Sequence, residues 1–132
     1  MNQQYLQYAK ELDKLGDKIL CINQTYYKNS LDDFKDFNTT VDLFNKGAYE
    51  YSECITILKN IKPPTIVLNE HNQMILELNK FVESNNEIWK LFKISGHKDI
   101  KSTVEKLIDI NKISSKNILK ISTAIGDILL AN

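Results

Sequence analysis

Apolar residues recur along the chain at alternating steps of three and four positions, the spacing of one face of an α-helix. The first such series is Tyr5, Tyr8, Leu12, Leu15, Ile19, Ile22 and Tyr26. The second is Phe34, Phe37, Val41, Phe44, Ala48, Tyr51, Ile55 and Leu58. The third is Val67, His71, Met74, Leu78, Phe81, Asn85, Ile88 and Phe92, and the fourth is Ile100, Val104, Leu107, Asn111, Ser114, Ile118, Ile121, Ile125 and Ile128. A mean period of about 3.5 residues is typical of helices with coiled-coil-like packing.

Helix-breaking and capping residues separate the four series. Ser30 can cap the second helix, Pro64 can occupy the first turn of the third, and Gly96 follows its end. The sequence therefore predicts helices over residues 3–28, 31–61, 64–94 and 99–130. Because short loops make consecutive helices antiparallel, we expect one all-α domain over residues 1–132, an elongated up-down-up-down four-helix bundle.

The charge composition excludes several functions. The chain has 17 acidic and 17 basic residues, so its formal net charge is zero, whereas nucleic-acid-binding domains normally carry a basic excess. Every basic residue apart from the two histidines is lysine, so an arginine finger or a bidentate guanidinium clamp cannot form. The abundance of isoleucine, lysine and asparagine indicates an AT-rich genome.

The sequence also bears on the compartment. Cys21 and Cys54 are too few for a disulfide framework, and no run of 18 apolar residues could span a membrane. The first residues lack the basic and apolar regions of a signal peptide. We therefore expect a cytoplasmic protein; an extracytoplasmic location stays open if a signal peptide has been removed.

His71 and Cys54 are the residues with the most reactive side chains near the predicted core. Antiparallel folding places them at about the same height, which allows a Cys–His pair for metal binding or nucleophilic catalysis. The alternative is a core histidine hydrogen-bonded to a hydroxyl group, beside a small apolar cysteine. Two ligands are too few for zinc, and Leu68 and Ile94 stand where the Glu-x-x-His pairs of a di-iron bundle need glutamate. We expect no metal, no cofactor and no enzymatic activity.

Two asparagines interrupt the apolar series of the third and fourth helices. Asn85 and Asn111 fall within about one turn of each other, and Ser114 continues the polar stretch. One hypothesis is a small ligand-binding site formed by these residues, with His71 further along the bundle. A second is that a buried asparagine pair fixes the helix register. A third is a local stutter that turns Ile110 and Ile113 inward.

Two surface features suggest a partner-binding function. Lys112, Lys116 and Lys120 repeat every four residues on the fourth helix, where an acidic partner or an anionic lipid surface could meet them, although a solvated face gives the same pattern. Tyr26 and Tyr27 could form an aromatic contact surface, because tyrosine favours protein interfaces.

The middle hairpin carries a family resemblance. Leu58-Lys59-Asn60-Ile61-Lys62-Pro63-Pro64, followed by His71, Ile75 and Leu78, resembles a hairpin in uncharacterised helical-bundle proteins and lipoprotein modules of low-GC Gram-positive bacteria. The resemblance covers residues 55–82 and implies a bacterial, non-catalytic bundle. The exported members carry a lipobox cysteine near their start, and this sequence has none there.

Together these features predict a non-enzymatic protein-interaction module of immunity, inhibitor or adaptor type, of bacterial, plasmid or phage origin. The alternative is a ligand-binding sensory bundle with its site around Asn85 and Asn111. We expect an unidentified protein partner or a weak homodimer, and no nucleic acid. Gly16 lies level with Phe44, so we also expect its missing side chain to accommodate that ring.

Overall fold

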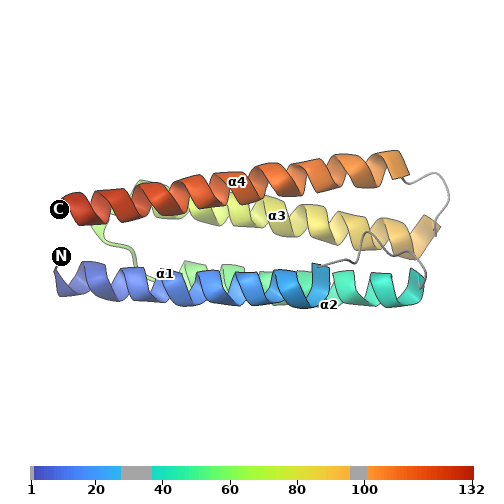
Figure 1. The fold of residues 1–132 in the computed structure, drawn as a ribbon, viewed down its shortest axis with the longest axis horizontal. Coiled ribbons are helices and arrows are strands. Elements are labelled where there is room, and N and C mark those ends of the chain that lie inside the picture. The colour runs from blue at the N-terminus through green and yellow to red at the C-terminus, as the bar shows by residue number, and fades with distance from the viewer. Residues whose placement is uncertain (1, 28–36, 96–100) are drawn as a thin grey trace.

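The chain forms an antiparallel four-helix bundle in a computed structural model that describes residues 2–27, 37–95 and 101–132. Helix α1 spans Gln3–Ile22, α2 spans Phe37–Asn60, α3 spans Leu68–Ser95 and α4 spans Lys101–Ala131. The helices alternate in direction, so the two ends of the chain lie at the same end of the bundle (Figure 1). The predicted up-down-up-down architecture is confirmed.

Two short helical turns modify the predicted boundaries. A π-helical turn, η1, continues α1 over Asn23–Tyr27, and a 3₁₀ turn, η2, precedes α3 over Thr65–Val67. Pro64 stands immediately before η2 as its N-cap residue, with an extended ψ of 148°. Its ring fixes φ and leaves no N–H to bond to a preceding helical turn. The predicted start of the second helix, the Ser30 cap and the Gly96 stop fall outside the described residues.

Where their side chains are described, most residues of the four apolar series are buried or packed against the buried cluster, as their spacing predicts. In α1 and η1 the series residues are either buried or packed against the buried cluster, from Tyr5 to Tyr26. The buried apolar side chains of the bundle are Tyr8, Leu15, Ile22, Ala48, Tyr51, Cys54, Ile55, Leu58, Val67, Met74, Leu78, Phe81, Val82, Ile88, Ile125 and Leu129. All of these side chains except Ala48 and Ile88 belong to one packed cluster to which all four helices contribute.

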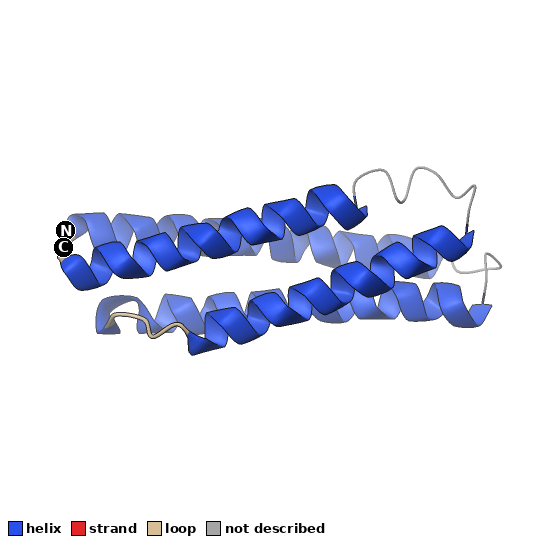
Figure 2. Ribbon diagram, turned by 90° about the horizontal axis from the view of Figure 1, so that it is seen from below, coloured by secondary structure: helices blue, strands red, loops and turns tan. Residues whose placement is uncertain are grey.

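The helices do not share their contacts equally. The most extensive packing joins α3 to α4, followed by α2 to α3, whereas α1 packs mainly on α2 and η1. The view from below shows the long antiparallel run of each pair (Figure 2). Within the described ranges, no helix is both long enough and apolar enough to cross a membrane.

The prediction for Gly16 is wrong. Gly16 is exposed on α1, and a Cβ atom placed on it would have no neighbouring atom within 4 Å. The expectation assumed that the residue level with Phe44 also faces it. Gly16 follows the seam residue Leu15 directly, and one helical residue is a rotation of about 100°, which turns it away from the core.

Candidate functional site

His71 lies in a buried hydrogen-bond relay that joins three helices. The side chain is 2% exposed, and its Nδ1 atom is 2.7 Å from the hydroxyl oxygen of Tyr8 on α1. Its Nε2 atom is 3.1 Å from the carbonyl oxygen of Leu58 on α2. A carbonyl can only accept, so Nε2 carries the proton, and Tyr8 donates to Nδ1 of the neutral ring. The relay ties α1 to the α2–α3 hairpin.

The electrostatics of the relay favour its neutral form. Burial lowers the pKa of His71, and the hydrogen bond to Leu58 opposes this effect only in part. Burial, and secondarily the negative charge of Glu70, raises the pKa of the Tyr8 hydroxyl. Tyr8 therefore stays protonated at neutral pH and remains a donor.

Cys54 does not complete a reactive pair with His71. Both ring nitrogens of His71 are already engaged by Tyr8 and Leu58. Burial raises the pKa of the Cys54 thiol to about 11, with Lys18 lowering it and two glutamates raising it slightly. A protonated buried thiol is a poor nucleophile and a poor metal ligand. In the part of the chain that the structure describes, no three His, Cys, Asp or Glu side chains cluster closely enough to hold a metal ion.

Asn85 and Asn111 meet across α3 and α4, as predicted. The Asn111 Nδ2 atom donates to Asn85 Oδ1 at 2.6 Å. The Ser84 hydroxyl lies within hydrogen-bonding reach of Asn111 Oδ1 and of the Phe81 carbonyl, 2.9 Å away. Ser114, 2% exposed, lies almost one turn beyond Asn111 on α4. We call Ser84, Asn85, Asn111 and Ser114 the polar layer. His71 lies more than three turns before Asn85 on α3 and belongs to the relay, not to the polar layer.

The polar layer decides one of the three hypotheses. Ile110 and Ile113 are 44% and 59% exposed, so no stutter turns them inward, and that hypothesis is wrong. The Asn85 side chain is 1% exposed, and its Nδ2 atom has no acceptor among the described residues. An unmet buried donor costs about 1–3 kcal/mol. The other two hypotheses stay open, because such a cost is compatible with a layer that fixes the helix register and with one that binds a ligand carrying the missing acceptor.

The predicted partner-binding residues differ in their exposure. Lys112, Lys116 and Lys120 are all exposed on α4. Tyr26 is partly buried and packs against the core, while the Tyr27 side chain lies outside the described residues. Among the tyrosines whose side chains are described, Tyr49 alone is largely exposed, at 66%.

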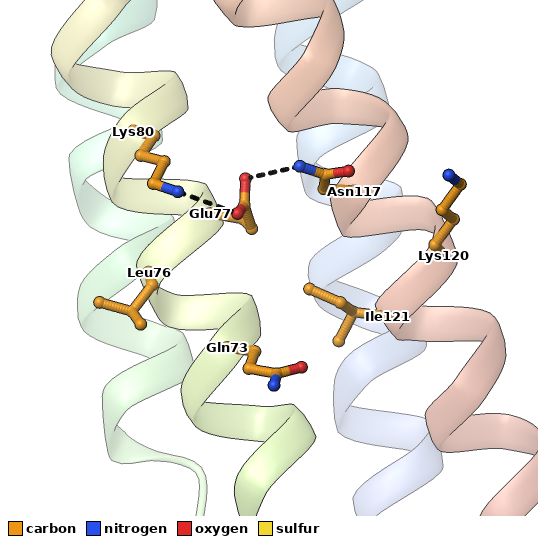
Figure 3. A pocket seen from close by; sticks show the side chains of 7 residues that line it. All are labelled: Gln73, Leu76, Glu77, Lys80, Asn117, Lys120 and Ile121. Carbon is orange, nitrogen blue, oxygen red and sulfur yellow. Dashed lines mark hydrogen bonds and ion pairs between the residues drawn. The ribbon is translucent and has the colours of Figure 1, made fainter.

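A surface groove between α3 and α4 escaped the sequence prediction. It encloses about 380 Å³ and is lined by Gln73, Leu76, Glu77, Lys80, Asn117, Lys120 and Ile121. Figure 3 shows Glu77 between the two helices, where Lys80 and Asn117 both point to its carboxylate. The donor–acceptor distances are 3.2 Å from Lys80 Nζ and 3.3 Å from Asn117 Nδ2. We call this feature the α3–α4 groove.

One signal in the sequence points to this groove. Leu76 stands off the apolar series of its helix, between Met74 and Leu78, and it is 62% exposed. Comparison of the chain with protein-family models, curated proteins and solved structures finds no match.

Proposed function

We propose that the chain is a non-enzymatic protein-interaction module of immunity, inhibitor or adaptor type, of bacterial, plasmid or phage origin. The observation that carries this proposal is the outer surface of α3 and α4, which combines large exposed apolar side chains with lysines. Leu76, Ile113 and Leu119 are 62%, 59% and 69% exposed. Of these three, Leu76 lines the α3–α4 groove, and exposed apolar side chains beside a polar-rimmed hollow are typical of sites that bind other proteins.

The buried polar groups support the same proposal. The relay is a neutral hydrogen-bonded core group that holds α1 in place. Cys54 is a protonated core thiol, and Glu77 is neutralised by its neighbours. Because these roles are structural, we assign the binding function to the exposed outer surface of α3 and α4.

The test is isolation of a stoichiometric complex. The tagged protein is used for affinity capture from its native host, and the complex is analysed by light scattering at low and high salt. We expect a defined partner or a weak homodimer that loosens as salt screens the rim charges. A chain that stays strictly monomeric and recovers no partner at either salt concentration would remove the proposal.

A ligand-binding sensory bundle is the second candidate, and the unmet Nδ2 donor of Asn85 favours it. A small molecule with an acceptor oxygen could supply the missing hydrogen bond. A thermal-shift screen against polar metabolites tests this candidate. Stabilisation by several degrees that disappears in Asn111→Leu would place it above the interaction module.

A further inference from the structure

We propose that the α3–α4 groove binds an acidic amphipathic helix of the partner protein. This inference rests on the proposed function and specifies its surface and the chemistry of its partner. The groove offers three things that such a helix needs, namely exposed apolar side chains, a positive charge carried by the α4 rim and a concave shape.

The apolar row lies along α4, and α3 contributes Leu76 to it. Ile121 lines the groove on α4, and Leu76 borders it on α3. Ile113 lies one turn before the groove residue Asn117, and Ile110 extends the row by most of another turn. From residue 110 to residue 121 the row measures about 16 Å at 1.5 Å per residue, or roughly three helical turns. A partner helix of that length can contact it with side chains at positions i, i+3, i+4 and i+7.

The charge of the groove is positive. Residues 110–124 contain three lysines and no acidic residue, and Asp109 and Asp127 lie beyond the two ends of this segment. Lys80 on the α3 rim pairs with Glu77, so the two lysines and one glutamate of the lining leave a net positive charge, and Lys120 makes no ion pair with any described residue. Acidic side chains on the partner are the complement of these rims.

The one acidic residue in the groove does not oppose an acidic ligand strongly. The Glu77 side chain is 14% exposed, and its carboxylate already accepts hydrogen bonds from Lys80 and Asn117. Its charge is therefore largely compensated within the groove. It contributes a fixed polar contact at the centre, with the apolar row on either side.

The shape favours a helix over a lipid surface. Membrane-binding helices insert a convex apolar face into the headgroup region, with lysines on the opposite face. Here Ile121 lines a hollow between two helices, and lysines stand on both of its rims. A cylinder with apolar and acidic stripes fits between those rims, whereas a flat bilayer contacts only their tips.

Fluorescence anisotropy with a defined peptide tests this inference. The probe is a labelled amphipathic helix of roughly 20 residues, long enough to be helical, with leucines at i, i+3, i+4 and i+7 and glutamates elsewhere. A second peptide replaces every glutamate with lysine, and a third arm uses phosphatidylserine vesicles. The protein is tested as wild type, Leu76→Asp and the Lys116→Glu, Lys120→Glu double variant, with Lys14→Glu on the exposed face of α1 as the matched control.

We expect the glutamate peptide to bind wild type and Lys14→Glu alike, and to bind the double variant about tenfold more weakly. Leu76→Asp should abolish binding while circular dichroism shows an intact fold, because Leu76 is mostly exposed. Equal binding of the lysine peptide, equal binding by all variants, or binding to vesicles alone would overturn the inference. A captured native partner that still binds Leu76→Asp would overturn it as well, while leaving the interaction-module proposal in place.

Discussion

At the scale of single residues, the Tyr8–His71 hydrogen bond is the contact whose loss should matter most. Tyr8→Phe keeps the ring and removes the donor, so the buried Nδ1 acceptor of His71 loses its partner. Such an unmet group costs about 1–3 kcal/mol. We expect urea denaturation to show a loss of that size, with Tyr5→Phe, on a half-buried ring of the same helix, as the control. Equal effects of the two substitutions would show that the hydrogen bond contributes nothing.

His71 should also make the stability depend on pH. Burial lowers its pKa in the folded chain below the ordinary value of 6.5, so between the two pKa values the unfolded chain binds more protons. The contribution of His71 is therefore complete above about pH 6.5 and is lost as the pH falls toward the folded pKa. Two titratable groups stand next to His71, namely its hydrogen-bond partner Tyr8 and the preceding residue Glu70. Burial raises the pKa of Tyr8, so its hydroxyl stays protonated over this pH range.

The measurement compares the free energy of unfolding at pH 7.5 and pH 5 in wild type and His71→Gln. Glutamine cannot take up the proton, so the variant should lose less stability between the two pH values than wild type. An identical loss in both proteins would show that His71 titrates alike in the folded and unfolded chains.

The asparagine pair should behave as a coupled unit. Asn111→Leu leaves the Asn85 Oδ1 atom without its donor, which should cost about 1–3 kcal/mol. The Asn85→Leu, Asn111→Leu double variant removes both polar groups and should cost clearly less than the sum of the single variants. Asn117→Leu combined with Asn85→Leu is the control, because Asn117 bonds to Glu77 instead, and its effects should add. Additive effects in both cycles would mean that Asn85 and Asn111 are not energetically coupled, and this result would contradict a role of the pair in fixing the register.

At the scale of the elements, α1 contains a glycine that serves no packing role. Gly16 is exposed with open space around its Cβ position, and glycine is worse than alanine inside a helix by about 0.5–1 kcal/mol. Gly16→Ala should therefore raise the free energy of unfolding by about that amount, and the denaturation midpoint should rise with it. Gly126→Ala on α4, where the space is also open, should act in the same direction. A lowered midpoint would show that the position faces another side chain.

The helices were the most predictable part of the molecule, because their spacing follows directly from which residues must leave water. The seam of α1 and η1 from Tyr5 to Tyr26 was predicted residue by residue. The π-helical turn at Asn23–Tyr27 was not, since it depends on contacts with another helix. Asn23 there accepts a hydrogen bond from Tyr51 on α2, a pairing that only the assembled bundle reveals.

The sites were less predictable than the helices, because they too depend on contacts between helices. Periodicity placed His71 in the core and suggested a hydroxyl partner, but choosing Tyr8 required the relative heights of α1 and α3 to within one turn. The meeting of Asn85 and Asn111 was predicted, because both interrupt an apolar series at matching heights. The α3–α4 groove depends on side-chain positions across two helices, and Leu76 alone signalled it in the sequence.

At the scale of the whole molecule, the bundle has two unlike sides. Helices α3 and α4 pack most extensively on each other and carry the groove, whereas α1 packs mainly on α2 and is tied to α3 by the His71 relay. We propose that the outer face of α3 and α4 is the binding surface of this bundle.

Two-dimensional NMR of the ¹⁵N-labelled chain, titrated with the glutamate-rich peptide, tests that claim most directly. We expect the largest amide shift changes within residues 73–80 and 110–124, and no change in the amides of α1 or in those around Tyr49 on α2. Changes centred on α1 or α2, or no changes at saturating peptide, would contradict it.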